Sequence, residues 1–213
     1  MEYYARSDQL LAELFTEALD VAADDIDSYF TDKMFLPSDV VFVVFHAGLG
    51  QDFSVPYLDP TIYDLKSAYI DENMMGDIDP VNILGHDVNT GILLPETQNM
   101  IYFDVVEDIF GNPDFGTEDL CDIQMGLTGT FAFLLGYELG LPPLVNTDTG
   151  DPGVGFFGLM DHGSNNGRGV IPTPPVPFTR ILAGWSTLNS GDIINPFSNG
   201  DSLVKNLSAY DIA

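Results

Sequence analysis

Apart from its carboxylates, this sequence has few side chains that could bind a metal ion or transfer a proton. Its three histidines, His46, His86 and His162, lie far apart, and no two are four residues apart. Four-residue spacing is what places a zinc-binding pair on one face of a helix. The single cysteine, Cys121, excludes both an intramolecular disulfide and a cysteine-rich zinc site.

Carboxylates dominate the remaining chemistry. The chain has 33 Asp and Glu against 6 Lys and Arg, a net charge of −27 and a pI near 4.1. It therefore lacks the clustered cations with which proteins bind nucleic acid or anionic membranes, and neither is an expected partner. Hydrophobic residues make up 45% of the chain, enough to form a core. The charge fits an acidic, solvated surface, and less directly calcium sites built from carboxylates.

One short segment spaces oxygen-bearing side chains as a calcium loop does. Residues 146–151 (NTDTGD) place Asn146, Asp148 and Asp151 close together, without the full spacing of an EF-hand loop. Asn, Asp and Gly also favour tight turns, and a turn is the preferred interpretation. These three residues are kept as a candidate calcium site. No cofactor is expected for the chain, zinc included, and calcium is kept only as a candidate.

Two helices and one strand are predicted most directly. Residues 7–23 carry apolar side chains at helical spacing, followed by an acidic run at 24–27, and residues 120–139 form a second helix ended by glycine. Residues 40–45 (VVFVVF) are β-branched or aromatic with no polar alternation. They predict a strand buried on both faces, followed by a turn at residues 46–50.

Shorter elements complete a loop-rich α+β prediction. We expect a short strand at residues 67–70 and helices at 97–110 and 178–185, with long irregular loops in 54–90 and in much of the chain after residue 150. No internal repeat is visible, so residues 1–213 are predicted to form one domain. Neither a signal peptide nor a long uncharged apolar segment is visible.

Three separated segments resemble one family. They are residues 44–53 (VFHAGLGQDF), 126–142 (GLTGTFAFLLGYELGLP) and 153–164 (GVGFFGLMDHGS). Their order and spacing resemble the catalytic domain of the immune inhibitor A-like secreted metallopeptidases over roughly residues 10–190. The resemblance implies a zincin-like fold with an active-site helix against a buried-strand sheet, and an extracellular location. The strands that usually precede this region have no counterpart in the chain.

That family carries the motif HExxHxxGxxD, in which two histidines and an aspartate hold zinc and the glutamate is the general base. Aligned on this motif, Phe133 and Tyr137 stand at the histidines, Leu134 at the glutamate and Pro143 at the aspartate. Met160 matches the methionine of the turn beneath the metal. Phe, Leu and Pro offer zinc no lone pair, and a single Tyr cannot hold it. The resemblance thus implies the scaffold without the zinc site.

The sequence therefore predicts a catalytically inactive metallopeptidase-like domain with a binding or structural role in an extracellular protein. Its expected partner is a peptide or protein, added along an edge strand. One alternative is an active metallopeptidase with a relocated metal site that uses His162, Glu138 or nearby carboxylates. The other is a structural or assembly module that packs on further copies or domains. The oligomeric state is left open.

Overall fold

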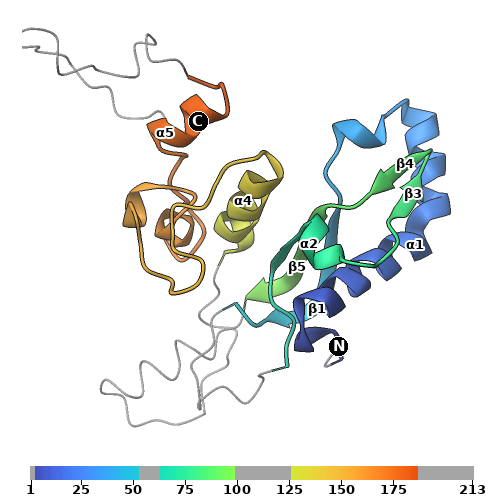
Figure 1. Cartoon of the computed structure of the whole chain (residues 1–213), viewed down its shortest axis with the longest axis horizontal. Helices are drawn as coiled ribbons and strands as arrows, with labels where there is room; N and C mark the ends of the chain where they lie inside the picture. The colour runs from blue at the N-terminus through green and yellow to red at the C-terminus, as the bar shows by residue number, and fades with distance from the viewer. Residues whose placement is uncertain (1–2, 53–62, 99–125, 187–213) are drawn as a thin grey trace, which may run out of the picture.

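A computed structural model describes residues 3–52, 63–98 and 126–186, and the mixed α+β class is confirmed (Figure 1). Within these residues, no helix combines the length and the apolar character that crossing a bilayer requires. The helices are α1 (Asp8–Lys33), α2 (Glu72–Met75), α4 (Leu127–Glu138) and α5 (Pro177–Leu182), and the strands are β1 (Val43–Gly50), β2 (Ala68–Ile70), β3 (Val81–Ile83), β4 (His86–Val88) and β5 (Gly91–Gln98), with short 3-10 turns η1 (Tyr4–Arg6), η2 (Pro37–Asp39), η4 (Gly155–Phe157) and η5 (His162–Asn165).

The first helix, α1, is longer than the sequence predicts. Ser7 caps it, because its Oγ accepts a hydrogen bond from Leu10 N at 3.2 Å. The helix then continues through the acidic run 24–27 to Lys33, and Met34 caps its end with a left-handed φ of 56°. Phe30 near this end is buried in the core. Packing of the second half therefore outweighs repulsion among its aspartates, and the predicted end at residue 23 is wrong.

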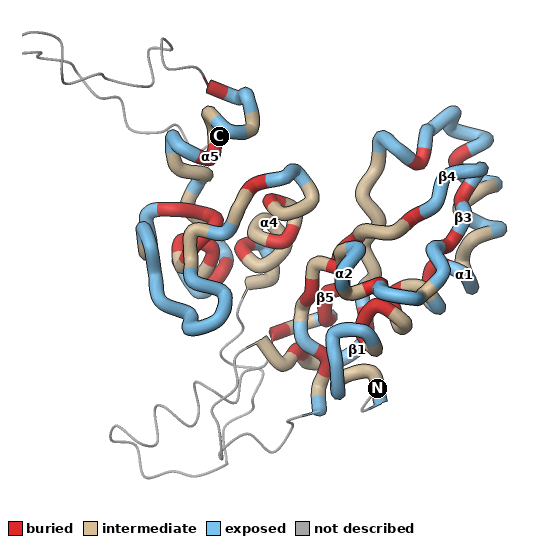
Figure 2. Tube along the Cα trace, in the orientation of Figure 1, coloured by how far each residue is buried: buried red, intermediate tan, exposed pale blue. Residues whose placement is uncertain are grey.

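The strand buried on both faces is β5. It lies between β1, which is parallel to it, and β2, which is antiparallel, in a three-stranded sheet of order β1-β5-β2. Successive side chains of a strand point to opposite faces. Leu93 accordingly joins the core cluster of α1, whereas Ile92 and Leu94 join the cluster of α4. All three side chains are completely buried (Figure 2).

The sequence assigned this doubly buried role to residues 40–45, and the outcome is mixed, because the run packs against the clusters on both faces but is only partly buried. β1 begins only at Val43, and the Phe45 side chain is 63% exposed. β1 forms an edge of the described sheet and has β5 as its single neighbour there, so its side chains are less enclosed.

The turn predicted at residues 46–50 is also wrong, because β1 continues to Gly50. One extra residue on β1 is absorbed by a shift in register between His46 and Leu49. Gly48 lies in this shift with a φ of 96°, a conformation that glycine adopts without steric cost.

Helix α4 covers the face of the sheet opposite α1, so the sheet lies between two helices (Figure 1). Leu134 packs there in one cluster with Ile92 and Leu94. Of the predicted helix 120–139, residues 120–125 lie outside the described part. The described helix begins after Gly126, whose backbone is extended.

The shorter predictions have mixed outcomes. The strand at residues 67–70 is confirmed as β2. The helix at 178–185 is present as α5 but already ends at Leu182. Of the helix at 97–110, the first two residues belong to β5 instead, and the rest lies outside the described residues.

Residues 81–88 form a hairpin, β3–β4, in a region where the sequence predicts loops. Its two-residue turn places Leu84 and Gly85 at φ of 46° and 81°, as turns of tight hairpins require. Asn82 Oδ1 accepts a hydrogen bond from Gly85 N at 3.0 Å. Asp27 Oδ1 of α1 accepts one from Leu84 N at 3.1 Å. The hairpin was missed because its strands have only three residues each and its turn lacks an Asn-Gly pair.

The position of β5 predicts the cost of shortening its central side chain. Leu93→Ala should lower the free energy of unfolding by about 2–5 kcal/mol, because it leaves a cavity between the sheet and α1. Val21→Ala on the exposed side of α1 is the control and should change it by less than about 0.5 kcal/mol. Urea denaturation measures both, and equal effects would contradict the central position of β5.

Candidate functional site

Two of the motif-equivalent residues on α4, Phe133 and Tyr137, are packed aromatic rings. Their centroids lie 5.1 Å apart in an edge-to-face arrangement. The ring of Tyr69 on β2 stacks on Tyr137 at 5.7 Å, with the planes 16° apart. We call Tyr69, Phe133 and Tyr137 the aromatic trio. The trio occupies the junction between α4 and the sheet with partly buried rings.

The two tyrosines of the trio, Tyr69 and Tyr137, are shielded from water strongly enough to shift the pKa of their phenol groups. Burial raises the pKa of Tyr137 above its ordinary value of 10. Burial, together with the negative charge of Glu138, raises the pKa of Tyr69 to about 12. Both phenols are therefore neutral near pH 7.

The other two motif-equivalent residues have different surroundings. Leu134 is only 7% exposed and packs on β5, where a hydrocarbon side chain suits the apolar neighbours Ile92 and Leu94. Pro143 follows the helix and is exposed. The structure therefore brings Phe133 and Tyr137 together, and it leaves Pro143 on the surface.

Met160 packs against α4. It is completely buried and shares a cluster with Phe133 and Tyr137. A Cβ atom at Gly136 would collide with Met160 Sδ, so glycine is required there for the helix to approach the methionine. The backbone oxygen of Met160 accepts a hydrogen bond from Leu144 N at 2.7 Å.

The next residue, Asp161, organises this loop, and sequence reasoning missed its role. Its Oδ2 accepts hydrogen bonds from the backbone N–H groups of Gly153, Val154 and Gly155 at 2.9, 2.6 and 2.8 Å, and its Oδ1 accepts one from His162 N at 2.7 Å. The side chain is buried. A lone aspartate in a glycine-rich loop was the available indication, but it has no partner at a recognisable spacing.

These hydrogen bonds determine the ionisation of Asp161. Burial by itself would raise its pKa, but the backbone N–H groups of Val154, His162, Gly155 and Gly153 stabilise the charged form. They hold the pKa below the ordinary value of 3.8. The carboxylate therefore stays charged at neutral pH and acts as the structural centre of the loop.

The candidate calcium residues form a turn closed by its own hydrogen bonds. Asn146 Oδ1 accepts from the backbone N–H groups of Asp148 and Thr149 at 2.9 and 3.1 Å. Asp151 Oδ2 accepts from Thr149 Oγ1 at 2.7 Å. All four residues are exposed. The geometry agrees with the turn interpretation, and calcium binding here stays a prediction.

The residues considered for a relocated metal site have separate surroundings. His162 Nε2 lies 3.2 Å from Gly150 O, and its ring contacts Phe156. Glu138 instead accepts a hydrogen bond from Thr90. Across the described residues, no group of three or more His, Cys, Asp or Glu side chains is placed to hold a metal ion.

His46 and Asp52, from the first motif segment, are interior polar residues. His46 lies in β1 and is buried, with Nδ1 3.1 Å from Ala47 O and with Nε2 lacking a hydrogen-bond partner. Asp52 accepts hydrogen bonds from Ser67 N and Oγ at 2.7 and 2.6 Å. Burial nevertheless raises the pKa of Asp52 above 3.8, since it outweighs those two hydrogen bonds.

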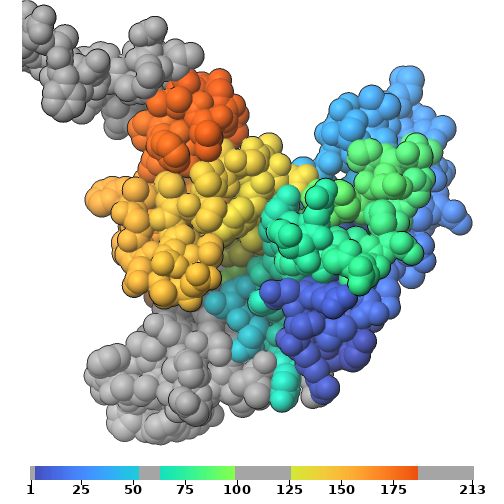
Figure 3. Space-filling view, in the orientation of Figure 1, coloured from blue at the N-terminus to red at the C-terminus, as the bar shows by residue number. Residues whose placement is uncertain are grey.

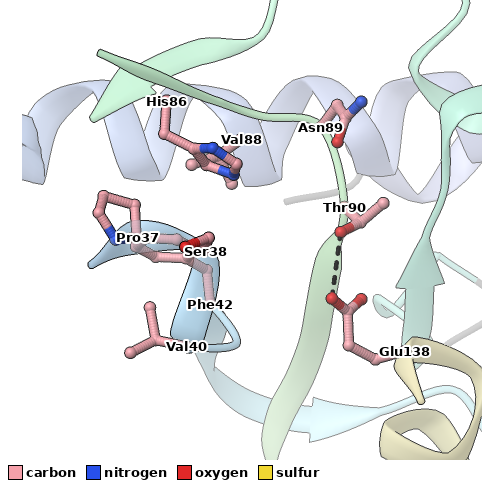
Figure 4. A pocket seen from close by; sticks show the side chains of 9 residues that line it. All are labelled: Pro37, Ser38, Val40, Phe42, His86, Val88, Asn89, Thr90 and Glu138. Carbon is pink, nitrogen blue, oxygen red and sulfur yellow. Dashed lines mark hydrogen bonds between the residues drawn. The ribbon is translucent and has the colours of Figure 1, made fainter. Parts of the chain in front are cut away.

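A small pocket lies at the C-terminal end of α4. It has a volume of about 140 Å³, and Glu138 lies at its edge, where Thr90 Oγ1 donates to Glu138 Oε1 at 3.3 Å (Figure 4). His86 also lines it; this side chain is exposed, as expected, but it belongs to β4 and not to a loop. Figure 3 shows the surface indented between the α4 part and the β3–β4 hairpin. Sequence reasoning missed this pocket, because its walls come from three distant segments.

No family model, curated protein or solved structure matches the chain. The metallopeptidase resemblance, the single-domain organisation and the extracellular location therefore stay predictions from the sequence.

The hydrogen bonds of Asp161 predict a pH-dependent contribution to stability. Because the folded-state pKa is lowered, the contribution is complete above the unfolded pKa of about 3.9 and is lost as pH falls through the folded pKa. Asp161→Asn should lower the free energy of unfolding at pH 7 by about 2 kcal/mol, a typical value for a hydrogen bond to a charged group. The difference from the parent chain should shrink below about pH 4.

Urea denaturation at pH 7 and pH 3 measures this difference, with Asp20→Asn on the exposed side of α1 as the control. The control should match the parent within about 0.5 kcal/mol. An Asp161→Asn deficit that is as large at pH 3 as at pH 7 would show that the charge is not responsible.

Proposed function

We propose that this chain is a catalytically inactive metallopeptidase-like domain that acts by binding a peptide or protein outside the cell. The observation that carries the proposal is the aromatic trio. The two positions at which the family places its histidines, Phe133 and Tyr137, are filled by rings that pack on each other and on Tyr69.

The energetics of packing support a site converted into core. An aromatic pair contributes about 0.5–1.5 kcal/mol beyond the area that it buries. Truncating a large core side chain costs about 2–5 kcal/mol, because a cavity remains. A carboxylate at position 134 would be enclosed next to Ile92 and Leu94 and would be costly without a metal ion. Leu134 avoids that cost.

The same framework supports a binding role. β1 is an eight-residue edge strand of the described sheet and runs parallel to β5. Edge strands can bind an extended peptide by backbone hydrogen bonds, with side-chain contacts adding specificity. The exposed ring of Phe45 offers apolar contact beside that edge. A peptide along β1 is the binding mode that we propose.

Metal content and proteolysis test the absence of catalysis. After incubation with zinc and removal of excess metal, the parent chain should retain much less than one zinc per chain by mass analysis, and it should not cleave casein. The reason is that Phe133, Leu134 and Pro143 carry no side-chain ligand. Stoichiometric zinc together with chelator-sensitive cleavage would overturn the proposal.

A restored motif is the matched control for this measurement. The variant with Phe133→His, Leu134→Glu, Tyr137→His and Pro143→Asp should retain about one zinc per chain if the backbone keeps the family geometry. Its metal binding would show that the assay detects a competent site on this scaffold. Failure of the folded variant to bind zinc would count against the resemblance of the backbone itself.

Self-assembly is a second candidate function, favoured by a different observation. Residues 154–185 expose eight large apolar side chains, and exposed apolar surface marks interaction sites where it is contiguous. The members of this exposed apolar group are Val154, Phe156, Phe157, Val170, Ile171, Phe178, Leu182 and Trp185.

Light scattering over a range of concentrations tests assembly. If this exposed apolar group joins copies, the apparent mass should rise with concentration, and Phe157→Ser should reduce the rise because Phe157 is 83% exposed. Val21→Ser, on α1 outside the group and 88% exposed, is the control and should leave the rise unchanged. A monomer at every concentration would exclude this second function.

A further inference from the structure

The C-terminal end of α1 and the turn of the β3–β4 hairpin expose large apolar side chains in one part of the surface (Figure 3). The hairpin turn lies beside α1, because Asp27 accepts a hydrogen bond from Leu84 N, and β4 lies against η2, which follows α1. We call this surface the α1-end patch. Its members are Tyr29, Met34, Phe35, Leu36 and Leu84.

We infer that the α1-end patch binds a segment of another protein that carries an apolar face flanked by Lys or Arg. The inference is independent of the proposed function, because it uses neither the motif-equivalent residues nor the edge of β1. It is also separate from the exposed apolar group of residues 154–185.

Two members of the patch hold an apolar side chain in a backbone conformation that glycine prefers. Met34 follows α1 at a φ of 56°, and Leu84 lies in the hairpin turn at 46°. Both side chains are exposed, Met34 to 88%. The Cβ atom makes this left-handed region costly for such residues, and glycine would remove the cost at both positions. A side chain that costs conformational energy and packs little on its own chain is expected to serve an outside contact.

The end of α1 is held in place before any partner binds. Phe30 O accepts hydrogen bonds from Met34 N and, at 3.0 Å, from Phe35 N. The ring of Phe35 lies 6.0 Å from that of buried Phe30 and 6.2 Å from that of Tyr29. A surface that is already ordered loses little conformational freedom on binding, and aromatic and methionine side chains are enriched at protein interfaces.

The surroundings of the patch are acidic, and this determines the partner. Residues 24–39 and 81–88 contain six Asp and a single Lys. The charge of this Lys33 is partly offset, because its Nζ lies 3.1 Å from Asp32 Oδ2. Carboxylates around apolar surface attract a segment with Lys or Arg beside its apolar side chains, and they repel anionic lipids. A basic, partly apolar protein segment therefore fits this surface better than a membrane does.

Amide-resolved NMR titration of the full chain tests the inference. The probe is a synthetic helical peptide of about 14 residues with Leu on one face and Lys on the other. It should cause saturable shifts at the amides of Phe35, Leu36 and Leu84. A peptide with Glu in place of Lys should not bind. A scrambled peptide of the same composition should bind at least about tenfold more weakly.

The variant with Met34→Gly and Leu84→Gly removes two apolar side chains and keeps every charge. It should weaken binding at least about tenfold. Its melting temperature should not be lower than that of the parent, because glycine relieves the left-handed backbone. A lower value would show that these side chains stabilise their own fold, and the inference would then be wrong.

Val21→Ser is the matched control, since Val21 on α1 is also 88% exposed but lies outside the patch, and it should leave the affinity unchanged. Should the double glycine variant not fold, Leu36→Ser takes its place as a second exposed member. Unchanged affinity of that variant would also contradict the inference.

Four other outcomes would overturn the inference. Shifts that do not saturate, or equal weakening by the double glycine variant and Val21→Ser, report general attraction to an acidic chain. Saturable shifts confined to β1 would support the proposed function instead. Without peptide binding, a mass in light scattering that rises with concentration only in the parent assigns the patch to a second copy. Binding to phosphatidylcholine vesicles, again without peptide binding, assigns it to a membrane.

Discussion

Both faces of β5 must be covered, and the arrangement of the other elements follows from this constraint. Ile92, Leu93 and Leu94 alternate between the two faces, and all are completely buried. Each face therefore needs its own apolar layer, which α1 provides on one side and α4 on the other. α4 has no side-chain cap at Gly126, so packing against the sheet, more than a local end signal, determines where this helix lies.

The loop beneath α4 is held by a buried charge as well as by hydrophobic contact. Asp161 gathers four backbone N–H groups around one buried carboxylate, and this fixes the neighbouring Met160 against Gly136. Such a carboxylate substitutes for regular secondary structure, because it pairs donors that a loop would otherwise leave unsatisfied. Met160 in turn shares one apolar cluster with Phe133 and Tyr137, so the loop packs against two rings of the aromatic trio.

Neighbouring residues at the end of α4 serve different purposes because a helix turns by about 100° per residue. Tyr137 faces the sheet and stacks on Tyr69, whereas Glu138 borders the pocket and contacts Thr90. The carboxylate of Glu138 nevertheless lies close enough to Tyr69 to raise the pKa of that phenol. The aromatic trio and the edge of the pocket are therefore electrostatically coupled.

The sequence by itself determined the α+β class, the first helix, the short strand β2 and the apolar character of Phe133 and Leu134, because these depend on local periodicity and residue type. Tertiary structure decided which strand is central. The runs 40–45 and 91–95 are both apolar, and only the order of strands makes one an edge and the other a core strand. The structure likewise decided the role of Asp161 and the existence of the Glu138 pocket. Both depend on contacts between groups that are distant along the chain, or on the backbone of a loop. The spacing of residues in the sequence does not indicate such contacts.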